Sequence, residues 1–405
     1  MNPVVFAWRN VWRSRRRSLV TMAAMSFALL MMILYTGLVA GYMGGLERNM
    51  LDLEMGDMQV FAPEYKRDPS LYTLIEDPGG LLAKLDDAGY PAAARLIGSG
   101  LAAAGDASAG VELRGVDVTR DKSVSEVYQH VIKGAWLDPA QPQGVVLGGR
   151  LARTLAVSVG DELVVLSQAS DGSMANDLFV VRGVLKNIAD GVDRAGVFMT
   201  ADAFREFFVV PEGAHQLIVR RPPARELDAA AAEVRGIAAG ESVQTWRDLM
   251  PMLASMMDSI TGAMLFMYGI IYMAIGIVLL NTMLMAVFER VREFGVLKAI
   301  GVSPRGVLTL IMLESLIQAL LAVAVATLLS IPCFAYLTTA GIDLTAIARD
   351  ISVMGLALDP IWRAEVGLGT YLYPIAMMLI IITLAAAYPA TRAAVIRPVE
   401  AMRHR

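Results

Sequence analysis

Four long stretches without a charged residue constrain this chain of 405 residues more than any other feature. They cover residues 18–46, 259–288, 315–342 and 366–391. A helix needs about 20 apolar residues to cross the hydrocarbon core of a bilayer, and each stretch is longer than that. Hydrophobic residues make up 56% of the chain and charged residues only 18%, against roughly a quarter charged in soluble domains. The sequence therefore predicts an α-helical membrane protein with four transmembrane helices and excludes a soluble globular enzyme.

The charges are distributed unevenly along the chain. Residues 1–17, 289–305 and 392–405 together hold 13 basic and 3 acidic residues, whereas residues 47–258 hold 20 basic and 31 acidic ones. Short basic segments stay on the cytoplasmic side of a membrane. We therefore expect a multi-pass membrane protein with both termini and the 289–305 loop in the cytoplasm and the large acidic domain on the outer side.

This topology divides the chain into successive segments. We expect a cytoplasmic amphipathic helix (1–17), a first transmembrane helix and stalk (18–46), an extracytoplasmic domain (47–258), a second transmembrane helix (259–288), a cytoplasmic coupling helix (289–305), a third transmembrane helix (306–342), an external loop (343–365), a fourth transmembrane helix (366–391) and a cytoplasmic tail (392–405). In the first segment, a face with Val4, Val5, Trp8, Val11 and Trp12 opposes several arginines. Such a helix suits the membrane surface.

The segment 47–258 has the pattern of a large α/β domain inserted between the first and second helices. Short β-branched stretches bounded by Gly, Asp or Pro predict strands. They lie at 56–62, 93–100, 110–116, 144–147, 162–167, 178–185, 196–199 and 216–220. Helices are expected at 81–88, 149–155, 201–208 and 224–238.

Apolar residues at the outer ends of the first two spans recur at heptad-like spacing. This spacing indicates two helices that leave the bilayer together as a stalk. Methionine adapts to irregular apolar shapes, so one interpretation is a cargo- or lipid-facing surface. Its residues are Met43, Leu46, Met50, Met256, Met264, Met267 and Ile271. Simple hydrophobic packing in the stalk and a thioether Cu(I) site are the alternatives.

Motifs for catalysis are missing from the sequence. It has no G-x-x-x-x-G-K-[ST] phosphate loop, and a G-x-G-x-x-A match at 98–103 is a weak pattern by itself. The three histidines and the single cysteine, Cys333, are scattered. We therefore expect no catalytic residue, no metal and no cofactor in this chain, and no nucleic-acid partner.

The most informative segment follows the second apolar stretch. It begins with the charged residues Glu289, Arg290, Arg292 and Glu293, and continues through Phe294, Gly295, Val296, Leu297 and Lys298 to Gly301. Gly301 is a typical helix stop, and Ser303 and Pro304 are typical of a helix start. A short helix between two spans can transmit force from a cytoplasmic partner, with Phe294, Val296 and Leu297 docking into that partner.

Two polar residues interrupt the apolar segments. Asn281 lies in the second span and Glu314 at the start of the third. An acid inside a membrane is costly and is often functional. We expect Glu314 to pair with an arginine of the coupling segment, and a proton relay is the alternative.

The segment from Asn281 to Ser303 resembles the N-x-x-x-x-x-V-x-E-R-x-R-E-x-G-x-L-K-A-x-G-x-S signature of ABC-transporter permeases of the FtsX/MacB/LolC-LolE type. The segments Ala7–Arg13, Gly144–Asp161 and Tyr388–Ala401 also resemble this family. The resemblance is nearest to the lipoprotein-releasing LolC/LolE branch, because the chain starts at the membrane and its external domain is large.

The resemblance implies a location, a set of partners and an activity. The location would be the cell inner membrane, with the large domain in the periplasm. The partners would be a dimer of a cytoplasmic ABC ATPase that holds ATP and Mg²⁺, a second permease, identical or homologous, a periplasmic carrier or adaptor protein, and membrane lipids. The expected function is the extraction of a lipid-anchored cargo by movement of the external domains. Tripartite efflux of amphiphiles and an FtsX-like signal relay without transport are the alternatives.

Overall fold

The chain divides into two units. One holds Met1–Gly44, Met257–Ile347 and Pro360–Arg405, and the other holds Gly45–Met256 and Ala348–Asp359. The computed structural model describes residues 3–13, 15–186, 188–210, 212–343, 352–353, 356–357 and 361–395. Most of the expected external loop 343–365 and the end of the expected tail 392–405 therefore lie outside the described residues.

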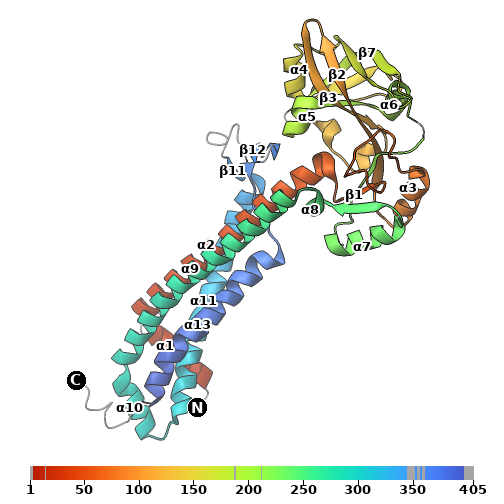
Figure 1. Cartoon of the computed structure of the whole chain (residues 1–405). Helices are drawn as coiled ribbons and strands as arrows, with labels where there is room; N and C mark the ends of the chain where they lie inside the picture. The colour runs from red at the N-terminus through yellow and green to blue at the C-terminus, as the bar shows by residue number, and fades with distance from the viewer. Residues whose placement is uncertain are drawn as a thin grey trace. The chain divides into compact units, whose positions relative to one another are not determined.

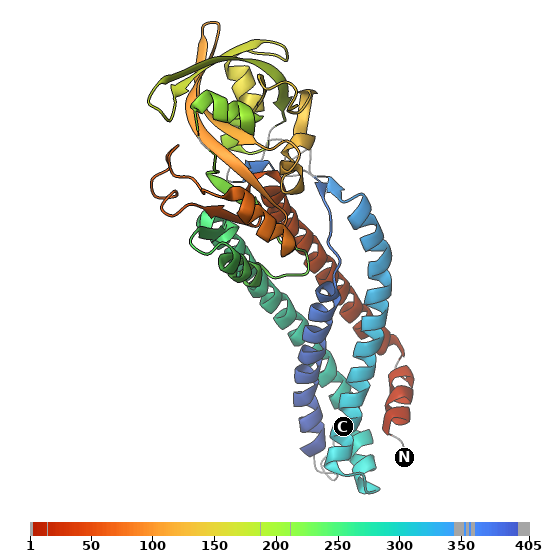
Figure 2. The ribbon, with the colours of Figure 1, turned by 90° about the vertical axis from the view of Figure 1, so that its right-hand side faces the viewer.

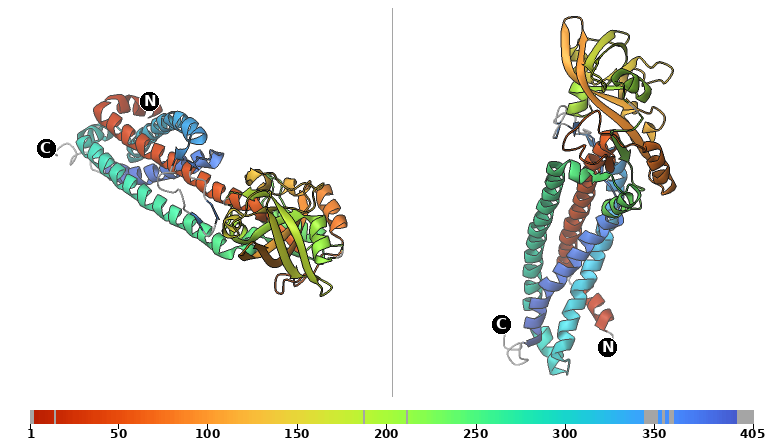
Figure 3. Two further views of the ribbon diagram at one scale, coloured as in Figure 1. Left: turned by 90° about the horizontal axis from the view of Figure 1, so that it is seen from above. Right: turned by 45° about the vertical axis from the view of Figure 1, so that its right-hand side comes forward.

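Four long helices dominate the first unit and run alongside one another (Figures 1 and 3). They are α2 (Arg15–Met50), α9 (Pro251–Glu289), α11 (Pro304–Thr339) and α13 (Leu368–Val395). Each is long and apolar enough to cross a membrane. These four helices correspond to the four uncharged stretches of the sequence.

The four helices share one apolar core. Met25 and Leu29 of α2, Tyr272 of α9, Ala322 of α11 and Met378 of α13 are all buried in it. Hydroxyl groups in this core find partners, as buried polar groups must. The Thr36 and Tyr268 hydroxyls are 2.9 Å apart, and the Tyr272 hydroxyl donates to the Pro374 carbonyl at 3.0 Å.

The N-terminal helix ends at Arg13, whereas the sequence pattern predicted an amphipathic helix over 1–17. Helix α1 (Pro3–Arg13) lies against α11 (Figure 2). Ala7, Asn10 and Val11 form its buried face, and Trp8 and Trp12 remain exposed. The assignment of Val11 to the membrane-facing side is therefore wrong, because tertiary packing against α11 uses that face.

A short segment follows α11 in the first unit. We call its residues 342–343 and 361–365 the strap. Strands β11 (Ile342–Asp343) and β14 (Ile361–Trp362) pair antiparallel. The Glu365 amide donates to the Gly37 carbonyl at 2.9 Å, and the Ala364 amide donates to the Leu337 carbonyl at 3.1 Å. These bonds tie the strap to α2 and α11. A second short pair, β12 (Ser352–Val353) and β13 (Leu356–Ala357), belongs to the other unit.

The second unit contains a split β-α-β subdomain. Strands β10 (Ser242–Thr245), β1 (Met58–Phe61), β9 (Gln216–Val219) and β2 (Ala92–Ala104) lie in that order, and all neighbours are antiparallel. Helices α3 (Pro78–Asp87) and α7 (Leu227–Ile237) pack with them around one apolar core (Figure 1). This is the ferredoxin-like β-α-β-β-α-β arrangement, with a second subdomain inserted between β2 and β9.

The inserted subdomain is a closed barrel of six strands. Around the barrel, β2 pairs with β3 (Ala107–Val116), then β8 (Gly196–Thr200), β5 (Gly144–Leu147), β7 (Met174–Leu185) and β6 (Glu162–Gln168), which pairs again with β2. Each of these six strands has a partner on both sides, so the strand order closes on itself. Strand β4 (Val131–Gly134) adds to β7. Further elements of this unit are η2 (Asp121–Ser123), η3 (Val127–His130), α4 (Gly149–Thr154), α5 (Asp190–Ala195), α6 (Ala201–Phe208) and α8 (Trp246–Leu249).

Within the second unit, charged residues hold the turn that follows α2. A π-turn, η1 (Leu51–Met55), follows α2 and ends at Gly56, which has a φ of +64°. The buried Asp57 carboxylate accepts from Arg221 Nε at 2.7 Å and from the Arg221 amide at 3.0 Å. Arg220 contacts both Asp52 and Asp57. The multiply bonded carboxylate of Asp57 therefore orders this turn within the second unit.

Candidate functional site

The short helix α10 (Val291–Ala299) joins α9 to α11 and forms the core of the candidate site. Arg290 interrupts the helix before it, with φ −110° and ψ 13°. Gly301 ends it with a φ of +99°, a conformation that favours glycine. The Ser303 hydroxyl then caps α11 by accepting from the Gly306 amide at 3.2 Å. Helix α10 is therefore a separate element between two long helices.

Arg290 ties this connection to α11. Its Nη1 donates to both carboxylate oxygens of Glu314, at 2.9 and 3.1 Å, and its Nε donates to Glu293 at 3.0 Å. The side chains of Arg290 and Glu314 are only 16% and 11% exposed. Burial opposes the charged form of Arg290, but Glu314 and Glu293 outweigh it and raise the pKa of Arg290 above its usual range. The pairing of Glu314 with an arginine of the coupling segment is confirmed.

The same charge network reaches the N-terminal helix. Glu293 also contacts the guanidinium of Arg13, the last residue of α1. The guanidinium of Arg290 lies 5.3 Å from the centre of the Phe294 ring, within cation–π range. Helices α1, α10 and α11 are thus joined by three acid–base contacts through Arg13, Glu293, Arg290 and Glu314.

Apolar packing holds the inner face of α10. Phe294 is only 3% exposed and lies in one cluster with Val287 of α9, Val307 and Ile311 of α11, and Ala390 of α13. Leu297 packs against this cluster, and Gly295 is buried. The sequence interpretation placed Phe294 and Leu297 on a docking surface. That assignment is wrong for Phe294, because its side chain fills the core of its own chain.

The outer face of α10 is formed by other residues. Val296 is 47% exposed, Ile300 at the carboxyl end is 74% exposed, and Arg292 is exposed as well. Ile300 was missed as a site residue, although its position one turn after Val296 is a periodic signal. An apolar pair beside an arginine, held on a rigid backbone, can fit a groove of another protein.

Lys298 secures the end of α10 to α13. Its ammonium donates to the Ala394 carbonyl in the last turn of α13, where the helix dipole favours a cation. Burial lowers the pKa of Lys298. Glu289 and Gly301, the remaining residues of the expected coupling segment, are exposed.

The structure separates the seven residues that the sequence suggested as a cargo-facing surface. Leu46 and Met50 are only 4% and 3% exposed, so they are covered by the chain itself and cannot face a cargo. Their assignment is wrong, and the packing alternative describes them. Met267 is 46% exposed. Met43, Met256, Met264 and Ile271 are half-buried. Asn281 of α9 is exposed.

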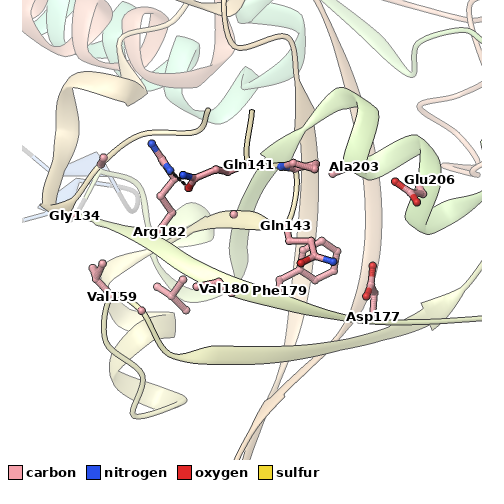
Figure 4. A pocket seen from close by; sticks show the side chains of 15 residues that line it. Gly134, Gln141, Gln143, Val159, Asp177, Phe179, Val180, Arg182, Ala203 and Glu206 are labelled. Atoms are coloured by element: carbon pink, nitrogen blue, oxygen red, sulfur yellow. Dashed lines mark hydrogen bonds between the residues drawn. The ribbon is translucent and has the colours of Figure 1, made fainter. Parts of the chain in front are cut away.

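A cavity of about 820 Å³ lies in the barrel subdomain, where no sequence signal indicated a site (Figure 4). The 134–144 connection, β7 and α6 surround it. Arg182 of β7 fixes the connection, since its Nε donates to the Trp136 carbonyl at 2.7 Å and it also contacts Asp138 and Gln141. Among the described residues, no group of three or more His, Cys, Asp or Glu side chains forms a possible metal site.

Two family models match the chain. Residues 18–237 match the MacB-like periplasmic core domain, and residues 265–398 match the FtsX-like permease C-terminal region. The first match alone covers more than half of the sequence. The chain therefore belongs to the FtsX/MacB family of ABC-type permeases, and it is a membrane component with a domain of the periplasmic type.

Solved structures with similarity to the chain are distant. The extracellular domain of the noncanonic ABC-type transporter YknZ from Gram-positive bacteria is 14% identical, and the match covers 46% of this chain and 98% of that one, with a TM-score of 0.33. The periplasmic region of MacB from Actinobacillus actinomycetemcomitans is 12% identical over 51% and 91%, with a TM-score of 0.34. A domain of a putative permease protein from Porphyromonas gingivalis is 13% identical over 46% and 85%, with a TM-score of 0.28. Family membership rests on the family models, and no curated protein matches.

Proposed function

We propose that this chain is the permease subunit of an inner-membrane ABC complex that extracts a lipid-anchored cargo, as in lipoprotein release. A separate cytoplasmic ATPase dimer binds ATP and Mg²⁺ and drives the permease through α10. A second permease, identical or homologous, completes the complex, and a periplasmic carrier receives the cargo. Permeases of the FtsX/MacB type work with ABC ATPase partners, which supports the general kind of partner.

The observation that carries this proposal is the construction of α10. Its inner face is tied to three long helices by Phe294, Arg290 and Lys298. Its outer face presents Val296 and Ile300. Because protein interiors are closely packed and transmit strain, a push on that outer face moves the ends of α9, α11 and α13 together. A helix that is tied to three long helices and exposed on its outer face suits the transmission of force, and a catalytic site does not require one.

The Arg290–Glu314 pair also supports a position for the membrane boundary. Arg290 directly follows the charged end of α9, so Glu314 lies at the level of that end. The ten residues from Pro304 to Leu313 then extend about 15 Å beyond this level. We propose that Glu314 lies at the cytoplasmic boundary and that the membrane-spanning part of α11 begins after it. The high cost of a charge at the bilayer centre favours this placement.

The surface of α9 supports the proposed cargo path. Met267 is exposed, with Met264 and Ile271 half-buried beside it on the helix. Adaptable methionine side chains suit acyl chains of variable shape. Efflux of small amphiphiles through a tripartite assembly would use the same surface and is the second candidate. A pure signal relay would leave it covered by protein.

Crosslinking from α10 tests the ATPase contact. A photo-crosslinker at Val296 or Ile300 should capture the cytoplasmic ATPase, whereas a probe at the buried Phe294 should capture this chain's own helices. The reverse pattern would show that α10 does not dock through its outer face.

A charge on the outer face of α10 should uncouple the complex. Val296→Asp places a carboxylate where an apolar contact is proposed, so we expect roughly 30-fold weaker ATPase binding, typical of losing an interface hot spot of about 2 kcal/mol. Thr391→Asp adds the same charge to an exposed position of α13 and serves as the matched control. Pull-down affinity and cargo release are the measurements. Equal effects of both variants would contradict the assignment.

The cargo is tested at Met267, with the buried Met50 as control. A photo-crosslinker at Met267 should capture a lipid-modified protein, and ATP should lower the yield by driving release. Capture of small amphiphiles alone would favour efflux. Capture of protein helices alone, unchanged by ATP, would favour the relay.

A further inference from the structure

An apolar groove runs between α1, α2 and α11 in the first unit, and its lining includes neither a residue of α10 nor one of the proposed cargo surface. It encloses about 440 Å³. Trp12 of α1, Leu19 and Phe27 of α2, and Leu321 and Leu329 of α11 belong to its lining. Leu19, Phe27 and Leu329 are exposed in the chain by itself, so an apolar occupant would bury them.

The groove has the length of one leaflet of a bilayer. On α2 it extends from Leu19 to Leu30, which is about 16 Å at the rise of an α-helix. The hydrocarbon core of a whole bilayer is about 30 Å thick. A single acyl chain from one leaflet therefore matches the groove, whereas a spanning helix of another protein would extend well beyond it.

Two arginines stand at the end of this groove that is nearer the N-terminus. Arg15 and Arg16 open α2 and precede Leu19 by four and three residues, so they lie on the same side of the helix as the groove. Both are exposed, and neither forms an ion pair with any residue that the structure describes. Arg13 and Arg290, by contrast, are already paired with acids.

We propose that this groove binds one anionic phospholipid of the cytoplasmic leaflet. The acyl chain fills the groove against Leu19, Phe27 and Leu321, and Arg15 and Arg16 hold the phosphate and its additional negative charge. Trp12 lies where the acyl chain meets the headgroup, the depth that tryptophan prefers in membranes. The apolar lining accepts any lipid chain, so the selection for a negative headgroup comes from the two arginines.

Fluorescence quenching of Trp12 tests this site directly. The chain is reconstituted in phosphatidylcholine nanodiscs that contain a small fraction of brominated phosphatidylglycerol or, separately, brominated phosphatidylcholine. Bromine quenches indoles in close contact, and subtracting the signal of Trp12→Phe isolates Trp12 from the other four tryptophans of the chain. We expect the anionic lipid to quench Trp12 at a roughly tenfold lower mole fraction, because each arginine near a membrane surface favours anionic lipid.

The double variant Arg15→Gln/Arg16→Gln should remove this preference. Arg305→Gln changes an exposed arginine at the start of α11 and is the matched control, which should keep it. Equal quenching by both lipids, or an unchanged preference in the double variant, would show ordinary annular lipid only. Absence of quenching by either lipid would show that protein covers the groove. Both results overturn the proposal. The comparison of the two lipids on the unaltered chain tests the proposal even if a variant fails to fold. The proposed transport function can fail with this site intact, since α10 and Met267 do not contribute to it.

Discussion

At the scale of single residues, the first unit uses a buried ion pair where an apolar contact would also fit. Removing Arg290 and Glu314 from water costs free energy, which their mutual attraction offsets only when the geometry is good. The two hydrogen bonds between them and the third to Glu293 supply that geometry. The pair therefore specifies how α9, α10 and α11 meet more than it adds stability.

The first prediction removes one partner of this pair. Glu314→Gln leaves the half-buried Arg290 with Glu293 alone, so we expect a loss of about 2 kcal/mol of stability, somewhat less than for a fully buried pair. The apparent melting temperature in detergent should fall. Arg290→Met/Glu314→Leu should recover most of the loss, and Arg13→Gln, at an exposed pair, should change it by about 0.5 kcal/mol or less. A double variant as unstable as Glu314→Gln would contradict this account.

The second prediction concerns His215, which directly precedes β9 in the second unit. Burial lowers the pKa of His215 to about 4. Its Nδ1 accepts from the Ile97 amide at 3.0 Å, which requires the neutral ring. An unfolded imidazole takes up its proton near pH 6.5, so the unfolded state binds more protons between pH 6.5 and 4. The stabilisation is complete above pH 6.5 and decreases as the pH falls through this window, by up to about 3 kcal/mol at pH 4.

The difference in melting temperature between the unaltered chain and His215→Gln measures this contribution. The amide oxygen of glutamine can still accept from Ile97 but does not titrate. The two proteins should diverge between pH 7 and pH 4.5, with the unaltered chain losing more stability. Parallel pH dependences would show that His215 does not titrate as described.

At the scale of elements, α2 shows how close packing determines which glycines matter. A Cβ at Gly41 would overlap the carbonyl oxygen of Arg363 in the strap, whereas a Cβ at Gly45 meets nothing within 4 Å. Both residues lie in the interior of the same helix, where glycine costs about 0.5–1 kcal/mol relative to alanine. Sequence alone gives no reason to treat them differently.

The third prediction is that alanine at these two positions has opposite effects. Gly41→Ala should lower the melting temperature, because the strap backbone must move away from α2. Gly45→Ala should leave it unchanged or raise it through the gain in helix propensity. Thermal unfolding of the two variants in the same detergent is the measurement. A stabilised Gly41→Ala protein would show that the strap does not approach α2 as described.

At the scale of the whole molecule, the proposed function assigns the moving parts of a transporter to this chain and ATP hydrolysis to a partner. Four apolar helices, the ion pair between Asp57 and Arg221, and the short helix α10 belong to one polypeptide. The fourth prediction is that the purified chain hydrolyses no ATP above background. ATP should be hydrolysed once the ATPase partner is added. Val296→Asp should prevent this ATP hydrolysis by the mixture. Hydrolysis by the pure chain would contradict the permease function.

The sequence by itself determined the features that depend on local pattern. Uncharged stretches of this length specify membrane-spanning helices. Without water in the hydrocarbon core, every backbone polar group must be hydrogen-bonded within the segment, as it is in a helix. Strand β5 and helix α6 lie at the predicted residues 144–147 and 201–208. Gly301 and Ser303 mark the end of α10 and the start of α11 as expected, since capping acts over one turn.

Only the tertiary structure decided which faces are covered. Strands β4 and β10 were not predicted, because Lys133 and the polar Ser242–Thr245 become strand residues through their partners β7 and β1. Closure of the barrel pairs β6 with β2, a long-range choice that no local pattern carries, whereas β6 and β7 are consecutive strands that form a hairpin. The same reason applies to Leu46, Met50 and Phe294. Their spacing shows an apolar face, but whether that face meets a partner or the chain's own core depends on residues far away in the sequence.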